Sequence, residues 1–251
     1  MRTAMVTLRA LLRRVASAPP TPSAPVAATS PRSAARTHVG RVRTINEDRV
    51  LDRPGRRLWA VADGMGGLSA GDVAADLAVA TLDALASVTE AALLEALQHA
   101  NTEILAAGGG RSGTTIVAAH IAGDLLTVFW AGDSRAYHVR GTRVRKLTRD
   151  HSVVQDLIDA GLLDEDKADG HPRSNVVTRA LGVVAPVAID TVRVTLEPGD
   201  RVMLCSDGVS RSLILRDLAR GGALNALADT LLTGAIERDG SDNASLVLIE
   251  V

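Results

Sequence analysis

Cysteine and aromatic residues are scarce in this chain of 251 residues, and each scarcity argues against a class of protein. Cys205 is the only cysteine, so neither an intrachain disulfide nor a cysteine-rich zinc site can form. Aromatic residues make up 2% of the chain, which argues against a stacking platform for single-stranded nucleic acid. No apolar run reaches the roughly 18 residues that a membrane-spanning helix needs. The core must therefore be built from alanine, valine, leucine and isoleucine.

Acidic residues are absent from residues 1–36, which hold six arginines. Removing these six from the 28 basic residues leaves 22 against 29 acidic ones, so residues 37–251 carry a net charge of −7. Such an acidic body is not typical of a nucleic-acid-binding protein. Residues 16–35 are rich in proline, serine and alanine, which favours disorder. We therefore expect a basic, disordered leader over residues 1–36 and one domain over residues 37–251.

The leader has other interpretations. Residues 1–15 have the spacing of a short basic helix, and a start that is rich in serine and arginine also matches a transit peptide or a weak membrane-surface anchor. A misassigned start codon is a further alternative.

The order of predicted elements favours antiparallel sheets covered by helices. Apolar runs and alternation predict strands at 58–62, 114–121, 125–131, 136–140, 143–147, 189–196, 201–205 and 245–251. Helical spacing predicts helices at 69–82, 87–104, from 152 onward and around 224–231, with capping boxes at Ser87–Glu90 and Ser152–Gln155. Because predicted hairpins stand between the helices, a doubly wound parallel sheet is disfavoured.

Acidic residues recur at the ends of the predicted strands, each beside a residue that favours a turn. They occur in Asn46-Glu47-Asp48, Asp63-Gly64, Gly132-Asp133-Ser134, Ser206-Asp207-Gly208 and Asp242-Asn243. A single Asp-Gly pair is most simply a surface turn, but five acidic strand ends together indicate a cation site. Oxygen ligands without histidine or cysteine favour Mg²⁺ or Mn²⁺ over Zn²⁺.

Eight short motifs also occur together in one order. They are HVGRVRTINEDR (38–49), VADGMGG (61–67), SGTT (112–115), AGDSR (131–135), LTRDHS (147–152), VTRALG (177–182), CSDGV (205–209) and SDN (241–243). Residues 38–251 therefore resemble the metal-dependent protein phosphatases of type 2C in their bacterial form. The resemblance implies an α+β fold in four layers, α-β-β-α, with two mainly antiparallel sheets flanked by helices.

The resemblance implies a metal centre that holds two Mn²⁺ or Mg²⁺ ions. Asp63 corresponds to the acid that bridges both ions, and Gly64 to the residue that offers its main-chain carbonyl. Asp207 and Asp242 correspond to the acids that bind one ion.

Four more residues receive roles from the same resemblance. Glu47 and Asp48 match the acidic pair that holds metal-bound waters in place, which counts Glu47 among the residues of the metal site. Asp133 is the candidate for a third, weaker ion, although its motif also suits a tight turn in which the aspartate accepts bonds from the main chain. Arg43, four residues before Glu47, is expected to grip the substrate phosphate.

The implied reaction is the hydrolysis of phosphoserine and phosphothreonine on proteins. Two metal ions about 3.5–4 Å apart offset the charge of a phosphomonoester dianion and let a water between them lose its proton. Asp63 and Arg43 are the catalytic candidates. Asp63 corresponds to the acid between the two ions, and the guanidinium of Arg43 can bind two phosphate oxygens at once, as a lysine cannot. We expect an enzyme of the bacterial cytoplasm that opposes a Ser/Thr kinase, without a nucleic-acid partner or a membrane span. Two alternatives are a phosphatase of an anti-sigma antagonist and a catalytically silent binding module on the same fold.

The general acid is not identified by this pattern. Some family members have a histidine after the Asp-Gly pair, where this chain has Met65. His151 is the substitute to consider; alternatively, it has only a structural role in the turn that caps the next helix. Arg179 suits either a phosphate contact or a salt bridge. Residues 153–175 correspond to the flap beside the site, and their acidic run suits a solvated face or, as an alternative, substrate selection.

Overall fold

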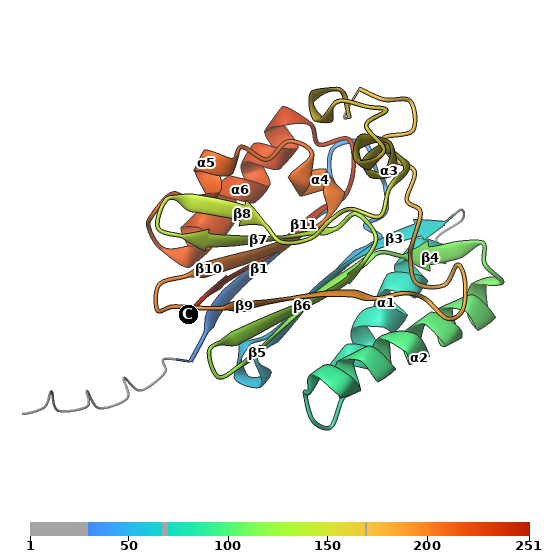
Figure 1. Cartoon of the computed structure of the whole chain (residues 1–251), viewed down its shortest axis with the longest axis horizontal. Coiled ribbons are helices and arrows are strands. Elements are labelled where there is room, and N and C mark those ends of the chain that lie inside the picture. The colour runs from blue at the N-terminus through green and yellow to red at the C-terminus, as the bar shows by residue number, and fades with distance from the viewer. Residues whose placement is uncertain (1–29, 67–69, 169) are drawn as a thin grey trace, which may run out of the picture.

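Two antiparallel sheets stacked between helices make up the part of the chain that the computed structural model describes, residues 30–66, 70–168 and 170–251 (Figure 1). The strands of the first sheet are β1 (Arg32–His38), β7 (Arg135–Arg140), β8 (Arg143–Lys146), β10 (Arg201–Cys205) and β11 (Ala244–Glu250). The strands of the second are β2 (Asp48–Arg53), β3 (Leu58–Gly66), β4 (Ser112–Thr114), β5 (Ile116–Ala122), β6 (Leu125–Ala131) and β9 (Asp190–Thr195). The strand orders are β1-β11-β10-β7-β8 and β2-β3-β5-β6-β9, with β4 paired to β3.

Helices cover the outer face of each sheet. The described helices are α1 (Ala70–Asp83), α2 (Glu90–Gly108), α3 (Val153–Asp159), α4 (Asp207–Ser210), α5 (Leu215–Leu218) and α6 (Leu224–Arg238), with single 3-10 turns η1 (Pro54–Arg56) and η2 (Glu165–Lys167). Of these, α3 and η2 belong to the flap. Figure 1 shows α1 and α2 below the second sheet and α4, α5 and α6 above the first. The predicted four-layer α-β-β-α fold is therefore confirmed. No helix in the described ranges has the length and apolar character needed to cross a bilayer.

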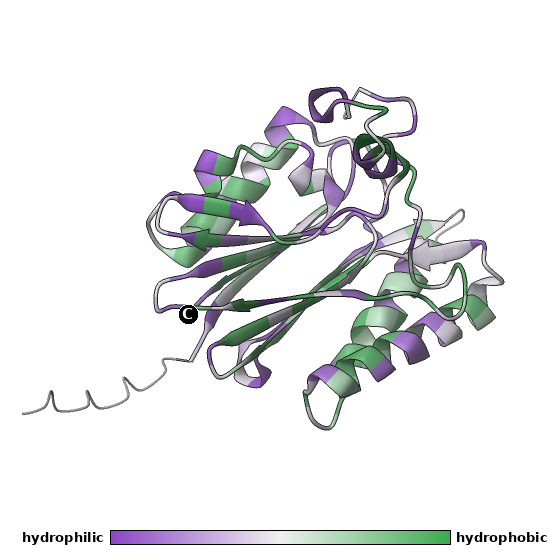
Figure 2. Cartoon of the chain, in the orientation of Figure 1, coloured by the Kyte–Doolittle hydropathy of each residue, from purple (hydrophilic) through white to green (hydrophobic). Residues whose placement is uncertain are grey.

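The alternation of side chains along each strand produces three apolar layers. In β3, Leu58, Ala60 and Ala62 pack under α1 and α2, whereas Trp59 and Val61 face the other sheet. This follows from the two-residue period of a strand, which sends successive side chains to opposite faces. Figure 2 shows apolar residues on the surfaces where the layers meet. The strand interiors need few aromatic residues because a sheet buried on both faces is filled by small and branched aliphatic side chains.

Local signals identified several elements correctly. Both predicted hairpins are present, and the Ser152 hydroxyl caps α3 by accepting from the main-chain N–H of Gln155 at 3.3 Å. The predicted cap at Ser87 is wrong: Thr89 caps α2, and its hydroxyl accepts from the N–H of Ala92 at 3.2 Å. The later start makes Glu90 the first residue of the helix rather than its third, so a capping box cannot form there.

The predicted boundary between Arg36 and Thr37 falls inside a strand and is corrected by the structure. β1 pairs with β11 along its whole length, from Arg32 opposite Glu250 to His38 opposite Ala244. Its small residues gave no apolar alternation, so the sequence suggested disorder where the main chain completes a sheet. The rest of the predicted leader, residues 1–29 with the possible basic helix, lies outside the described residues.

Candidate active site

A pocket of about 230 Å³ lies where several strand ends meet, and acidic side chains from five separate segments line it. The end of β3 lies beside the start of β2, and the end of β10 beside the start of β11, because these pairs are antiparallel. The acidic residues of the lining are Glu47, Asp63, Asp133, Asp207 and Asp242. The structure thus brings together five acidic residues that are widely separated in the sequence.

Asp63 reaches the pocket from the end of β3, and both of its main-chain groups are hydrogen-bonded. Its carbonyl oxygen accepts from the N–H of Thr115 at 2.9 Å and from the hydroxyl of Thr114 at 3.0 Å. Its own N–H donates to the Thr115 hydroxyl at 3.3 Å. These bonds fix the main chain at both sides of the Asp63 side chain, which leaves the carboxylate as the group available to a ligand.

Gly64 lies next to Asp63 in very close contact with the start of α1. A Cβ atom at Gly64 would lie 2.2 Å from the carbonyl oxygen of Gly71, and one at Gly71 would lie 2.6 Å from Oε1 of Glu47. Only glycine permits this approach of strand, helix and carboxylate. Gly71 was not predicted, because nothing in the sequence indicated which segment would pack against Gly64.

A second close contact joins the segments that carry Asp207 and Asp242. A Cβ atom at Gly208 would lie 2.0 Å from the carbonyl oxygen of Asn243, so the two main chains touch. The N–H of Ser206 also donates to the carbonyl of Ser245 at 3.0 Å. The Asp-Gly and Asp-Asn pairs seen in the sequence are therefore neighbours in the fold, each supporting the position of the other.

Asn243 ties the loop that carries Arg43 and Glu47 to this junction. Its amide nitrogen donates to the carbonyls of Val39 and Ile45 at 2.9 and 3.0 Å, and its amide oxygen accepts from the N–H of Glu47 at 2.8 Å. Asn243 is buried, so these bonds are protected from water. The sequence placed Asn243 in a motif but gave no sign of this role.

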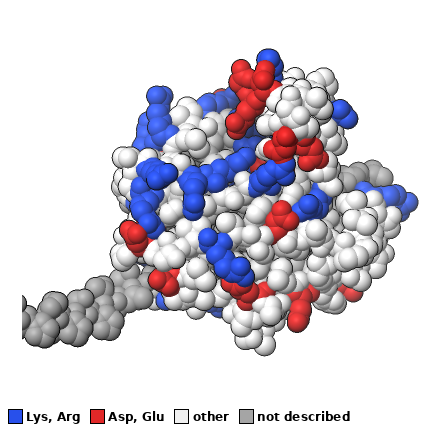
Figure 3. All heavy atoms as spheres, in the orientation of Figure 1, with Lys and Arg blue, Asp and Glu red and all other residues white. Residues whose placement is uncertain are grey.

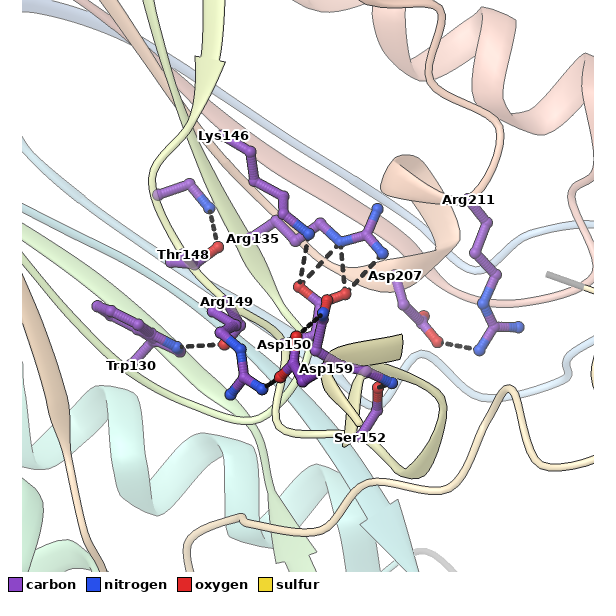
Figure 4. A network of polar contacts seen from close by, with 12 residues as sticks. Trp130, Arg135, Lys146, Thr148, Arg149, Asp150, Ser152, Asp159, Asp207 and Arg211 are labelled. Atoms are coloured by element: carbon purple, nitrogen blue, oxygen red, sulfur yellow. Dashed lines mark hydrogen bonds and ion pairs between the residues drawn. The ribbon is translucent and has the colours of Figure 1, made fainter. Parts of the chain in front are cut away.

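Two arginines line the pocket beside the acidic residues. Nη2 of Arg43 donates to Oδ2 of Asp242 at 2.9 Å, and this bond raises the pKa of Arg43. Arg211 pairs with Asp207 four residues earlier, across the short helix α4 (Figure 4). Arg43 was predicted, whereas Arg211 was missed, although its four-residue spacing from Asp207 was a usable signal.

The pocket is electrostatically unfavourable for its own carboxylates. Burial raises the pKa of Asp133 to about 7, and Asp207 adds to the effect. Burial and the neighbouring carboxylates raise the pKa of Asp63, and burial does the same to Asp207 despite its arginine. Charged carboxylates crowded in this way repel one another, and a divalent cation between them reverses that repulsion.

Asp48 lies behind the pocket rather than in its lining. It is buried, and Oδ2 accepts from the Ser206 hydroxyl at 2.8 Å. Burial raises the pKa of Asp48 to about 7. Oδ1 of Asp48 and Oε1 of Glu47 are buried without a hydrogen-bond partner.

These observations fit a site for Mg²⁺ or Mn²⁺. The donors are oxygens only, and two buried carboxylate oxygens lack partners, which water or a cation would satisfy. In the part of the chain that the structure describes, no three acidic, histidine or cysteine side chains converge closely enough to hold an ion by themselves. Two of the candidates, Asp207 and Asp242, are instead paired with arginines.

His151 and Arg179 do not line the pocket and have structural places. Nδ1 of His151 accepts from the N–H of Gly132 at 3.1 Å, and its ring stacks on Trp130 with the centroids 6.1 Å apart. Arg179 pairs with Asp190 at 2.7 Å. His151 therefore supports the turn that carries Asp133, and Arg179 forms the salt bridge that was one of its two predicted roles.

Comparison with known proteins gives one consistent result. A profile of the protein phosphatase 2C family matches residues 37–233. The chain is 36% identical over 236 residues to the serine/threonine phosphatase stp of Listeria monocytogenes, covering 86% of this chain and 94% of that protein.

Solved structures agree. The serine/threonine phosphatase PstP of Mycobacterium tuberculosis superposes with a TM-score of 0.82 at 34% identity, covering 88% of this chain and 98% of the other. The catalytic domain of PstP in complex with two manganese ions gives a TM-score of 0.79 at 33% identity, with coverages of 88% and 97%.

Proposed function

Because this chain belongs to the protein phosphatase 2C family, whose members are metal-dependent phosphatases, we propose that it hydrolyses phosphoserine and phosphothreonine on proteins. One observation carries the proposal: carboxylates from five separate segments line a single pocket together with Arg43 and Arg211. A silent binding module would not need this concentration of mutually repelling groups.

Each acidic residue has a proposed part in holding two ions. Asp63 would bridge them, Asp207 and Asp242 would bind one, and Glu47 and the carbonyl of Gly64 would complete the set. Mn²⁺ or Mg²⁺ held there would supply the charge that offsets the phosphate dianion and acidifies a water molecule. The buried oxygens without partners and the oxygen-only donor set support this assignment.

Three other residues would act around that centre. Asp133 is the proposed ligand of a third, weaker ion, because it lies in the same pocket on a different turn. Asp48 would support the centre from behind through its contact with Ser206. Arg43 is half-exposed and uses one nitrogen on Asp242, so its remaining N–H groups are available to grip phosphate oxygens and orient the substrate.

The proposed setting is a bacterial cytoplasm, where the enzyme would reverse the action of a Ser/Thr kinase. Relatives named serine/threonine phosphatases in Listeria monocytogenes and Mycobacterium tuberculosis support the bacterial part of this proposal.

The decisive test is hydrolysis of a phosphothreonine peptide with Mn²⁺, with Mg²⁺ and with a chelator. We expect turnover only with a divalent cation. Asp63→Asn should reduce the turnover rate by more than about a hundredfold, because replacing even a residue that only hydrogen-bonds to a metal ligand lowers activity by about 10–100-fold. Asp124→Asn, at an exposed hairpin turn, is the matched control and should not change the rate. Full activity in the chelator, or in Asp63→Asn, would refute the proposal.

Arg43→Ala tests the phosphate grip in the same assay. We expect the Michaelis constant to rise more than the turnover number falls, because the guanidinium binds phosphate in both the ground state and the transition state. A fall in turnover number alone would assign Arg43 a different role.

A further inference from the structure

A second cavity, of about 370 Å³, joins the active-site pocket. Asp133, Asn175, Asp207 and Arg211 line both, so the two spaces share a wall. The far side of the second cavity includes residues of β8 and α5, which pack against each other. A chain leaving the active site through this cavity would therefore reach the outer edge of the first sheet.

That edge is strongly basic. β8 is the last strand of its sheet. Lys146 lies on the face of β8 that packs toward α5, where Arg216 is found, whereas Arg143 and Arg145 lie on the other face of this edge strand. All four are exposed. Figure 3 shows lysine and arginine atoms gathered over the part of the surface where Figure 1 places α5, β7 and β8. We call these four residues the basic edge.

The charges of the basic edge are largely uncompensated within the protein. Among the described residues, Arg143, Arg145 and Arg216 have no acidic partner, in contrast to the paired arginines of the same sheet. Lys146 lies 3.5 Å from Asp150, which is already held by Arg135 (Figure 4). In a domain of net negative charge, a local concentration of free cations produces a positive field that attracts anions.

We propose that the basic edge binds acidic side chains of the phosphoprotein substrate, at positions along the polypeptide away from the phosphate being removed. The inference rests on the proposed function, since it assumes that a phosphorylated polypeptide occupies the active site. A polypeptide fits better than another polyanion, because Lys146 lines the cavity that joins the active site and the three arginines lie near its outer end. The recognised chemistry is a carboxylate or a second phosphate on the same chain.

The flap side of the second cavity gives the selectivity a direction. Glu165 lines the cavity from the flap, and its neighbours Asp164 and Asp166 are exposed, with Asp164 paired to Lys167 and Glu165 and Asp166 left without a cation among the described residues. Acidic substrate residues are repelled there and attracted at the basic edge. The enzyme should therefore prefer acidic residues on one side of the phosphothreonine only.

The test compares kcat/KM for four phosphothreonine peptides with Mn²⁺ present. One has three glutamates before the phosphothreonine, one has three after it, one has a second phosphate in place of the glutamates, and one has glutamines throughout. At low salt we expect one glutamate order to exceed the glutamine peptide by about three- to tenfold, the sum of a few exposed ion pairs. Because exposed charges are screened, about 0.5 M salt should remove most of this preference.

Charge reversal locates the effect. Two variants are compared: the double variant Arg143→Glu with Arg145→Glu, and the single variant Arg216→Glu. In each, the ratio of kcat/KM for the preferred glutamate peptide to kcat/KM for the glutamine peptide should come close to one. Arg111→Glu makes the same charge change per residue at an exposed site that lines neither cavity, and it should leave the ratio as in the parent. A gain with the second phosphate larger than with glutamate would identify phosphate as the preferred anion, and a gain limited to glutamate would identify carboxylate.

Three results would overturn the inference: equal kcat/KM for acidic and glutamine peptides, an unchanged ratio in the charge-reversed variants, or an equal loss in Arg111→Glu. Inhibition of glutamine-peptide hydrolysis by an oligonucleotide more strongly than by a glutamate-rich peptide would assign the basic edge to nucleic acid instead and would also overturn it. In all of these cases, continued hydrolysis of the glutamine peptide leaves the proposed function intact. Failure to hydrolyse any peptide would refute the proposed function itself.

Discussion

Replacing Asn243 with alanine removes the amide that connects the loop of Arg43 and Glu47 to the β11 end of the active site. The amide makes three hydrogen bonds, all to main-chain groups, and it is only 6% exposed. Truncation leaves the N–H of Glu47 and the carbonyls of Val39 and Ile45 without this partner. Since the substitution removes buried hydrogen bonds rather than packing, the loss can be worked from their number.

A net contribution of about 1 kcal/mol for each hydrogen bond gives a loss of about 3 kcal/mol in the free energy of unfolding. For a domain of this size, 1 kcal/mol corresponds to a change in Tm of about 2–4 °C, so Tm should fall by about 6–12 °C. Activity should fall as well under conditions where the variant is fully folded, because the loop positions Arg43 and Glu47 within the active site.

Urea unfolding followed by circular dichroism measures the first effect, and kcat/KM for a phosphothreonine peptide measures the second. We expect a lower midpoint at an unchanged m value. Asn243→Asp keeps the oxygen that accepts from Glu47 but places a buried carboxylate oxygen against the carbonyls of Val39 and Ile45, so at pH 7 it should be at least as destabilising as the alanine variant. Ser241→Ala, exposed and two residues away, is the control. A loss below about 1 kcal/mol for Asn243→Ala, within the range of ordinary surface substitutions, would refute the reasoning.

Two further predictions concern Gly208 and Asp200. Gly208→Ala would put a methyl group 2.0 Å from the carbonyl oxygen of Asn243. It should therefore weaken Mn²⁺ binding, measured by calorimetry, and lower the free energy of unfolding by about 1–3 kcal/mol. Gly221→Ala, with open space around it, should do neither, and equal Mn²⁺ affinity in the two variants would contradict this prediction. Burial alone would raise the pKa of Asp200, but hydrogen bonds from Arg140, the N–H of Glu197 and His138 outweigh it and lower the pKa to about 2. The ionised carboxylate therefore stabilises the fold fully above its unfolded pKa of about 4, and this contribution is lost as the pH falls toward 2. Asp200→Asn should therefore lower the free energy of unfolding by about 2 kcal/mol at pH 7, and urea titrations at decreasing pH should show the difference from the parent narrowing below about pH 4; a constant difference would contradict the assignment.

The sequence predicted those parts of the site that depend on local signals. Asp63 and Asp207 each stand at the end of an apolar strand and before a glycine, and that pattern is visible without a structure. The family resemblance then assigned roles that no local signal carries, such as the phosphate grip of Arg43. Glu47 and Asp48 were predicted together as an acidic pair that holds metal-bound waters. Glu47 lines the pocket and Asp48 lies behind it, because adjacent residues at the start of a strand point to opposite sides.

Elements without apolar alternation were missed. β1 contains small and polar residues, and β2 begins and ends with charged residues at the edge of its sheet, so neither has the pattern of a strand. Both are strands because a partner already present offers its main-chain groups: β11 to β1, and β3 to β2. Tertiary pairing thus determined structure that local preference did not, which is a known limit of strand prediction.

The convergence of the acidic residues is a consequence of main-chain packing rather than of attraction between the side chains. Carboxylates in a shared pocket repel one another, so their own interactions work against the arrangement. The close contacts of Gly64 with Gly71 and of Gly208 with Asn243 hold the acidic segments together through atoms that carry no charge. The fold therefore supplies the energy that keeps these carboxylates close, and a cation that enters relieves a repulsion that is already in place. This is why adding a methyl group at Gly208, which changes no charge, should weaken metal binding.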